Sequence, residues 1–333
     1  MKRIFSIITI WSLLTLPVLA AAPVNFGNTP NPLPATDVKV VKKVPLPLIN
    51  EEIKGQPVTP SGKDKNNGSS ATAVGAATGV LGEPVSGAKY AVVIGICDYP
   101  GTANDICISD GDSYNMRKAL LERYGYNSDN VYWFRDMGGT VDGVSYGIPS
   151  RANIYDAITN KIKANATSGS EVVFFFSGHG ADGIARDDDS EARDEGIVVH
   201  DGTAKQYIWD GELRNWFNGF PTTRIVFVFD SCLAGGMNDV AAAGRVVSMA
   251  TGETQVAYVY SGGEYGEGVF SHYFVNEGMY LGLADKYDHD QDTILGEGSD
   301  VVVEEAFDYT KAKITIPRQV PVISDNFTND LLF

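Results

Sequence analysis

The stretch that decides the fold is EVVFFFSGHG, residues 171–180, in which an apolar run leads into a histidine flanked by glycines. A second stretch of the same form, RIVFVFDSC at 224–232, ends on an acid, a serine and a thiol. Near-continuous apolar runs are typical of strands covered on both faces of a parallel sheet. Functional side chains gather beyond the carboxyl ends of such strands. The two stretches therefore predict an imidazole and a thiol at one edge of one sheet.

The rest of the folded region repeats this alternation of strands and helices. Further apolar runs are KYAVVIGI (89–96), NVYWFR (130–135), RVVSMA (245–250) and QVAYVY (255–260). Helical candidates lie between or after the runs, at 113–124, 152–164, 210–217, 270–283 and 303–311. This order predicts an α/β fold with a mainly parallel central sheet and helices on both faces, in one domain over residues 86–333.

The N-terminal region has a different composition. Lys2 and Arg3 precede an apolar run at 4–16, and small residues follow at 18–20. Because the run is shorter than a spanning helix, we expect a cleaved signal peptide at 1–21, no stable membrane anchor, and a secreted or periplasmic protein. Residues 22–85 are rich in Pro, Gly, Ser, Asn and Lys, and predict a disordered linker or pro-segment.

The charge balance restricts the partners. The chain has 26 Lys and Arg against 42 Asp and Glu, a formal net charge of −16. A field of this sign repels phosphate backbones, so nucleic acid is not an expected partner. Such a field attracts cations. Two kinds of partner therefore remain: metal ions that carboxylates bind, and peptide substrates that contain basic residues.

His179 and Cys232 suit nucleophilic catalysis. A cysteine becomes a strong nucleophile when a neighbouring base lowers its thiol pKa, and a histidine can also protonate a leaving amine. The N–H groups of Gly180 and Cys232 are candidate oxyanion donors. Taken singly, each residue is more often a buried hydrophobe or a satisfied polar group. Their shared position after apolar strands favours a catalytic dyad.

The order of motifs resembles that of the caspase-like cysteine peptidases, in their metacaspase-like and clostripain-like branch. It runs from SGHG through an acidic loop and DEGIVVHD to DSC. The segments AVVIGICDYPG, GDSYNMRKALLERYGY and TRIVFVFDSCLAGG resemble the same group. The resemblance implies that His179 is the general acid and base and that Cys232 is the nucleophile. The chain departs from it after the cysteine, where Leu233-Ala234-Gly235 stands in place of the HSG of many metacaspases.

The same resemblance implies an acidic specificity pocket. One acid is Asp230, and the other matches Asp112, with Asp110 as a close competitor. A carboxylate there would pair with a substrate Arg or Lys. Taken locally, Asp112 is as well explained as an acid facing a helix N-terminus. Ser261 and Gly262 are candidates for the wall along which a peptide lies.

Two acidic clusters in the sequence predict calcium-binding sites. The loop 186–195 contains six carboxylates, and we expect Asp187, Asp188, Asp189 and Asp194 to be ligands. The resemblance implies an activating calcium here. In the second cluster, Asp288, Asp290 and Asp292 match the first half of an EF-hand loop, with Asp300 or Glu305 as the possible closing ligand. However, Thr293 stands where Gly usually makes the turn, so a solvated acidic turn is the alternative.

The sequence therefore predicts an exported cysteine endopeptidase that cuts after Arg or Lys, depends on calcium and is autoprocessed from a zymogen. Arg186 and Arg193 are candidate self-cleavage sites. The alternatives are an inactive calcium-stabilised binding module and a dyad peptidase that cuts after Asn or Asp. Cys97 and Cys107 lie close enough in sequence for a disulfide, or both are free and buried.

Overall fold

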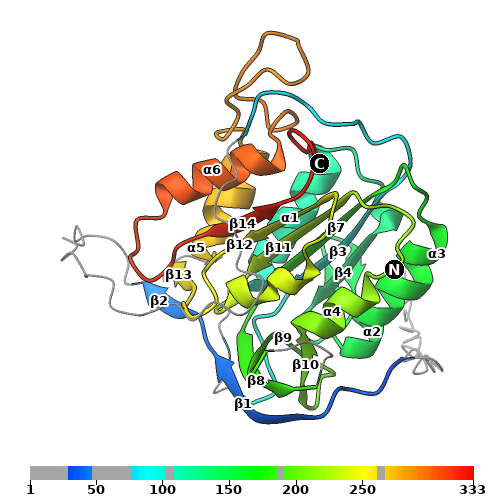
Figure 1. Ribbon diagram of the computed structural model, residues 1–333, viewed down its shortest axis with the longest axis vertical. Helices are drawn as coiled ribbons and strands as arrows, with labels where there is room; N and C mark the ends of the chain where they lie inside the picture. The colour runs from blue at the N-terminus through cyan, green and yellow to red at the C-terminus, as the bar shows by residue number, and fades with distance from the viewer. Residues whose placement is uncertain (1–28, 47–76, 102–104, 106–108, 187–190, 261–266) are drawn as a thin grey trace, which may run out of the picture.

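A central sheet of six strands organises the structure, a computed structural model that describes residues 29–46, 77–101, 105, 109–186, 191–260 and 267–333. The strand order is β14-β12-β11-β7-β3-β4. The strands are β3 (Lys89–Gly95), β4 (Val131–Arg135), β7 (Glu171–Ser177), β11 (Ile225–Asp230), β12 (Arg245–Met249) and β14 (Val322–Asp325). Only β14 runs antiparallel to its neighbour in this sheet. The mainly parallel α/β fold predicted from the sequence is confirmed (Figure 1).

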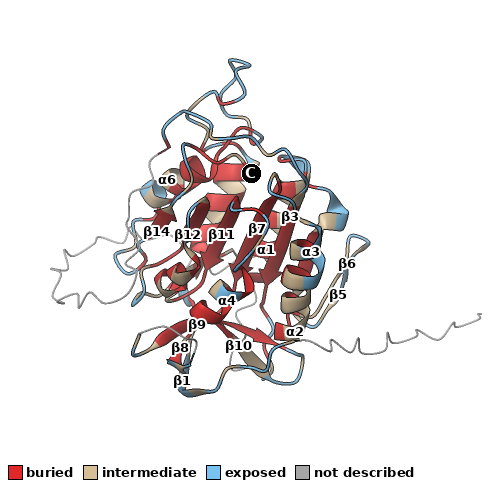
Figure 2. Ribbon diagram, turned by 45° about the vertical axis from the view of Figure 1, so that its right-hand side comes forward, coloured by how far each residue is buried: buried red, intermediate tan, exposed pale blue. Residues whose placement is uncertain are grey.

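Helices cover both faces of this sheet. One layer contains α1 (Ser109–Glu122), α5 with η5 (Val269–Ser271 and His272–Tyr280) and α6 (Val303–Lys313). The other contains the continuous helix α2-η3-α3 (Arg151–Tyr155, Asp156–Ile162, Lys163–Asn165), α4 (Asp210–Trp216) and η4 (Ala234–Val240). Side chains alternate along each strand, so that Val93 packs in the first layer and Val92 in the second. The central strands between the two layers are buried, as the red colour in Figure 2 shows.

A smaller antiparallel sheet lies beyond the carboxyl ends of the central strands. Its order is β1-β8-β9-β10, formed by Ala35–Val41, Gly180–Ala185, Asp194–His200 and Lys205–Trp209. A separate hairpin joins β5 (Gly139–Val141) to β6 (Val144–Tyr146), and the short η2 turn (Ser128–Asn130) precedes β4. Because β8 begins one residue after His179, the small sheet fixes the exit of the chain from the candidate dyad.

The last apolar run differs from its prediction. Only Tyr258–Tyr260 forms a strand, β13, and it pairs in parallel with β2 (Val44–Leu46) and not with the central sheet. The place next to β12 is taken by β14, which the sequence pattern did not reveal because its run is only four residues long. The edge of the sheet is thus closed by a strand from the C-terminal end of the chain.

The expectation that residues 22–85 are disordered is wrong for the part that the structure describes. Residues 29–46 form β1 and β2 and run along the lower edge of the molecule in Figure 1. Thr78 and Gly79 donate backbone N–H groups to the Asp330 carboxylate. The physical reason is docking, since these short segments take their hydrogen bonds from the folded domain and not from their own sequence pattern.

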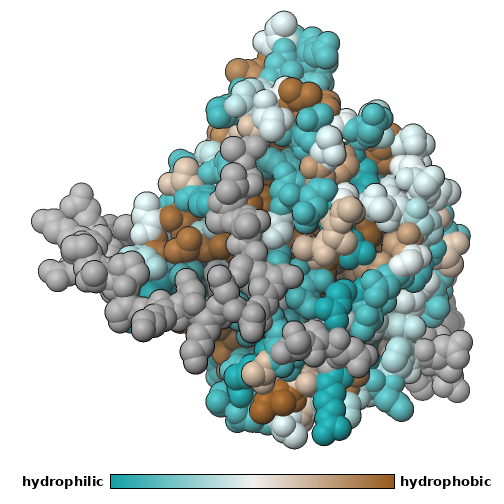
Figure 3. All heavy atoms as spheres, in the orientation of Figure 1, coloured by the Kyte–Doolittle hydropathy of each residue, from teal (hydrophilic) through white to brown (hydrophobic). Residues whose placement is uncertain are grey.

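The surface agrees with the charge balance. The face drawn in Figure 3 is mainly hydrophilic, and hydrophobic residues appear on it only in scattered patches. Among the described residues no helix is both long and apolar enough to cross a membrane. The proposed signal peptide at 1–21 lies outside the described residues.

Candidate active site

The register of two central strands brings the histidine and cysteine motifs together. In the parallel pair of β7 and β11, Ser177 lies opposite Asp230. His179 and Cys232 each follow two residues later, at the same edge of the sheet. The contact between the motifs is close, because a Cβ atom on Gly180 would lie 2.1 Å from the carbonyl oxygen of Cys232. Only glycine fits at this position without moving one of the two backbones.

Tyr99 positions the histidine. The His179 ring is fully buried and stacks on the Tyr99 ring, with 4.9 Å between centroids and 16° between planes. The Tyr99 hydroxyl accepts the backbone N–H of His179 (3.0 Å) and donates to the carbonyl of Val198 (3.1 Å). Burial raises the pKa of Tyr99, so the phenol stays neutral. No motif in the sequence marks Tyr99 as a site residue, although it follows the first apolar run at the same sheet edge.

The Cys232 thiol is enclosed in this state of the molecule. Its residue is 1% exposed, and Sγ accepts the backbone N–H of Ala257 at 3.2 Å. Burial raises the pKa of Cys232 to about 11, whereas the Ala257 N–H and the charge of Lys43 lower it. The thiol is therefore protonated at neutral pH until a base accepts its proton or water reaches the site.

Asp112 and Asp230 form a buried acidic pocket beside the thiol. Asp230 accepts hydrogen bonds from the backbone N–H (3.0 Å) and the hydroxyl (2.7 Å) of Ser271. Asp112 accepts one from the Ser177 hydroxyl at 2.6 Å and one from the Gly268 N–H. A Cβ atom on Gly268 would lie 2.1 Å from Asp230 Oδ2, so glycine is needed for this approach. Both carboxylates are thus held in fixed positions.

The pocket contains a lysine from the N-terminal segment. Lys43 Nζ lies 2.8 Å from Asp230 Oδ1 and 3.8 Å from Asp112 Oδ2, and it donates to the Ser177 hydroxyl at 2.9 Å. All three charged side chains are fully buried. Buried charges are costly unless they are paired, so the ammonium and the carboxylates depend on each other. Burial raises the pKa of Asp112 to about 7; the Lys43 charge opposes this shift and Asp230 adds to it.

The remaining residues predicted for the specificity pocket and the disulfide are not found beside Asp112 and Asp230 in the described part of the chain. Asp110 pairs with Arg135, so it is not part of the pocket. Ser261 and Gly262 lie outside the described residues. Cys97 is buried, but Cys107 is outside the described residues, so the proposed disulfide stays a prediction.

The first acidic cluster has a partly different membership from the predicted one. Asp187, Asp188 and Asp189 lie outside the described residues. Asp194 does not join the group that the structure assembles; its Oδ2 accepts the N–H of Ala185 within the β8-β9 hairpin. The group consists of Glu191, Glu195 and Asp210, whose carboxylate oxygens lie within 4.8 Å of one another. Burial raises the pKa of Glu195 to about 9, and the charges of Glu253 and Glu191 add to it. Carboxylates in this arrangement fit a hard cation such as calcium.

The second cluster contains three of the four predicted ligands. Asp288, Asp290 and Asp292 also bring oxygens within 4.8 Å of one another, on the surface. Glu305 is not in this group, and its predicted role as closing ligand is corrected. Its carboxylate accepts hydrogen bonds from the backbone N–H groups of Lys286, Tyr287 and Val302. The bond to Val302 caps the N-terminus of α6, and the other two fix the chain just before the acidic cluster.

A parallel sheet that presents a histidine and a cysteine at the carboxyl ends of adjacent strands is the arrangement of a caspase-like cysteine peptidase. Residues 89–241 match the family model described as "Metacaspase, peptidase C14 domain". This segment of the chain is therefore similar to the peptidase C14 domain of the metacaspases, which are caspase-like cysteine peptidases.

Curated proteins of this kind are similar to the chain over part of their length. Metacaspase-4 of Arabidopsis thaliana is 34% identical over 156 residues, which cover 46% of this chain and 35% of the relative. Metacaspase-9 of the same plant is 31% identical over 154 residues, 45% of each chain. Metacaspase-1 of Cryptococcus neoformans is 30% identical over 158 residues, 46% of this chain and 33% of the relative. The chain thus spans between a third and a half of the length of these relatives.

Proposed function

We propose that this protein is a cysteine endopeptidase that hydrolyses peptide bonds after Arg or Lys. The observation that carries the proposal is the ammonium group of Lys43 between Asp112 and Asp230, next to Cys232. The pocket accepts a long basic side chain, satisfies its charge, and lies beside the proposed nucleophile. A substrate Arg or Lys would take the place of Lys43.

In the proposed reaction, His179 accepts the proton of the Cys232 thiol and the sulfur attacks the carbonyl carbon of the substrate. The N–H groups of Gly180 and Cys232 would stabilise the negative oxygen that forms. The C–N bond then breaks as His179 returns the proton to the leaving amine. Water attacks the resulting thioester, releases the acid product and restores the thiol. Tyr99 keeps the imidazole plane in position through these steps.

The pocket disfavours the alternative of cleavage after Asp, because two buried carboxylates would face a third. An Asn side chain is neutral and would leave the pocket charges without a counter-charge, at a cost of a few kcal/mol. The alternative of an inactive binding module gives no reason for the register that places His179 and Cys232 at the same edge. We therefore favour the basic-residue peptidase.

The test is an assay of the purified protein, with and without millimolar calcium, on fluorogenic peptides that end in Arg, Lys, Asn or Asp. We expect hydrolysis of the Arg and Lys peptides alone, and none by the Cys232→Ala variant. Cys97→Ala is the matched control, because it removes a buried thiol that the mechanism does not use. Hydrolysis that survives Cys232→Ala, or equal cleavage of all four peptides, would contradict the proposal.

We also propose that calcium binds Glu191, Glu195 and Asp210 and regulates the enzyme. The carboxylates are close together and Glu195 is buried among other acids, so a cation would relieve their repulsion. Glu195→Gln should weaken calcium binding measured by isothermal titration calorimetry, whereas Glu297→Gln, which is outside this group, should not. The cluster at Asp288, Asp290 and Asp292 is a second, solvent-exposed candidate.

Export and autoprocessing complete the proposal. The N-terminal signal sequence supports secretion or residence in a periplasm, with protein or peptide substrates in that compartment. Of the two candidate self-cleavage sites, Arg186 is exposed, whereas Arg193 is bound to Asp37 and Asp182. We therefore favour Arg186. Mass spectrometry of the active protein should place a new C-terminus there, and Arg186→Gln should remove it.

A further inference from the structure

We propose that residues Thr29–Leu46, here called the strap, are a built-in inhibitor that keeps the enzyme inactive by holding Lys43 in the specificity pocket. The inference rests on the proposed function, since it assigns a regulator to the same site. The strap is fixed at three places along its length, and each of them contributes to the position of Lys43.

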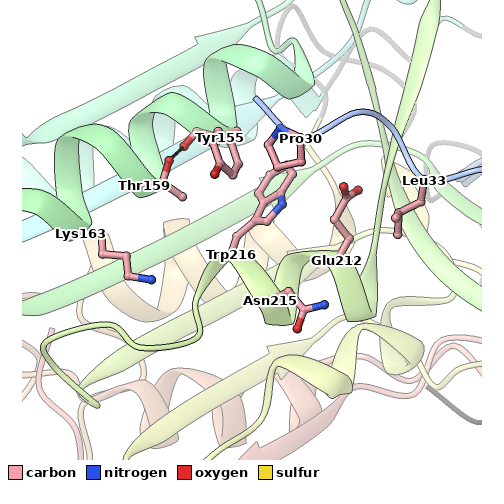
Figure 4. Close-up of a pocket in the computed structure, with 8 residues that line it drawn as sticks. All are labelled: Pro30, Leu33, Tyr155, Thr159, Lys163, Glu212, Asn215 and Trp216. Atoms are coloured by element: carbon pink, nitrogen blue, oxygen red, sulfur yellow. Dashed lines mark hydrogen bonds between the residues drawn. The ribbon is translucent and has the colours of Figure 1, made fainter. Parts of the chain in front are cut away.

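The first anchor lies at the start of the strap. The Arg151 guanidinium donates to the backbone carbonyls of Pro30 and Asn31 and also pairs with Glu212. Pro30 lines a pocket together with Leu33, Tyr155 and Trp216, and Figure 4 shows these side chains grouped around it. The ion pair is nearly buried, so the carbonyls bind a donor that is already held in place.

The second anchor is the strand β1. It adds to the free edge of β8 in antiparallel register, with Val41 opposite Gly180. The Asp37 carboxylate binds Arg193 at 2.9 Å, in the loop that also carries Glu191. The strap therefore ends its first strand directly beside the residue that follows His179, where a substrate would need to enter.

The third anchor follows Lys43. The Val44 N–H donates to the Ala257 carbonyl at 2.9 Å, and the N–H of the same Ala257 binds Cys232 Sγ. From there β2 pairs in parallel with β13, and the side chain of Leu46 is buried in the core. The amide bond after Lys43 and the Cys232 thiol therefore both bind Ala257, the first through the carbonyl of that residue and the second through its N–H.

These anchors make the strap an inhibitor and not a substrate. Cleavage after Lys43 would release nothing, because β1 holds the chain before the bond and β2 holds the chain after it. The two chain ends made by the cut would stay in place, so re-formation of the peptide bond would be favoured over release of the segment. A tethered segment also competes with free peptides at an effective concentration of about millimolar or higher. Only a small open fraction of the enzyme is then available to substrate, and the apparent activity falls by that fraction.

The experiment compares two pairs of full-length variants at fixed calcium. Lys43→Ala removes the side chain in the pocket, and its matched control is Lys42→Ala, at the exposed neighbouring lysine. Leu46→Asp places a charge where the strap enters the core, and its control is Pro45→Asp, at an exposed position. The second pair keeps Lys43 and the pocket carboxylates, so it covers the case in which Lys43→Ala fails to fold.

We expect Lys43→Ala and Leu46→Asp each to raise kcat/KM on an Arg peptide by about tenfold or more, and both controls to match the wild type. Alkylation of Cys232 by iodoacetamide, located by mass spectrometry, should accelerate in the same two variants. Equal rates of hydrolysis and of alkylation across all the proteins would overturn the strap proposal. Faster alkylation without hydrolysis of any basic peptide would instead uphold the strap and refute the proposed peptidase specificity.

Discussion

The central sheet and the strap both contain short strands, but they form for different reasons. β7 is buried along its whole length, and its apolar side chains pack on both faces. β1 is largely exposed or half-buried, and its hydrogen bonds come from one neighbour, β8. The first strand is specified by its own residues and the second by the surface on which it docks. A segment with weak hydrophobic patterning can therefore still be placed accurately when a folded domain supplies its partners.

The largest expected effect on stability is in the central sheet. Phe174→Ala removes a fully buried ring of β7 that contacts Phe217, Phe227 and Phe229. We expect a loss of about 3–5 kcal/mol in the free energy of unfolding, from lost burial and the cavity left behind. Val40→Ala in the strap should cost far less. Urea denaturation checks both, and equal losses would contradict the distinction drawn between the two regions.

The next effect concerns the pocket that the two regions share. Asp230→Asn leaves the shape of the pocket but removes the carboxylate that lies 2.8 Å from the Lys43 ammonium. We expect kcat/KM on Arg peptides to fall about 100-fold, as for the loss of a buried charge pair. The comparison is best made in a Lys43→Ala background, so that the strap does not compete. A decrease smaller than threefold would mean that Asp230 does not bind the substrate.

The pH dependence should reveal Asp112. Its folded-state pKa is raised to about 7, so the carboxylate is charged above that pH and neutral below it. Protonation removes one of the two negative charges that bind a basic side chain. The Lys43 charge lowers this pKa, so in the Lys43→Ala variant the carboxyl is protonated at a higher pH than in the wild type. The kcat/KM of this variant on Arg peptides should therefore fall as the pH drops from the alkaline range through neutrality, by up to about tenfold per unit. Asp112→Asn should flatten this profile, and an unchanged profile would contradict the assignment.

The smallest effect is at the edge of the strap. Asp37→Ala removes the ion pair with Arg193, which is largely exposed to solvent. Pairs of this kind contribute little, so we expect basal activity to rise by no more than about twofold. The effect should shrink further at high salt, because screening weakens the pair in the wild type as well. A large, salt-independent increase would mean that Asp37 has another role.

The sequence predicted the parts of the molecule that depend on local pattern. The runs at 171–176 and 224–229 are strands, and their common register brings His179 to Cys232 as expected. Asp112 and Asp230 also lie together. Lys43 was missed, because nothing in KVVKKVPL distinguishes a lysine that docks in a pocket from one in solvent. Tyr99 and the group of Glu191, Glu195 and Asp210 were missed for a similar reason, since residues distant in sequence meet only after folding.

The position of β1 at the end of its sheet has a consequence for solubility. With the strap in place, β1 is the edge strand and β8 is an interior one. Once the strap leaves, the outer side of β8 presents a row of unpaired N–H and C=O groups to any extended chain. The protein without its docked strap would then expose an unpaired strand edge beside His179, the proposed catalytic histidine. The strap thus shields the protein from self-association for as long as it holds the enzyme inactive.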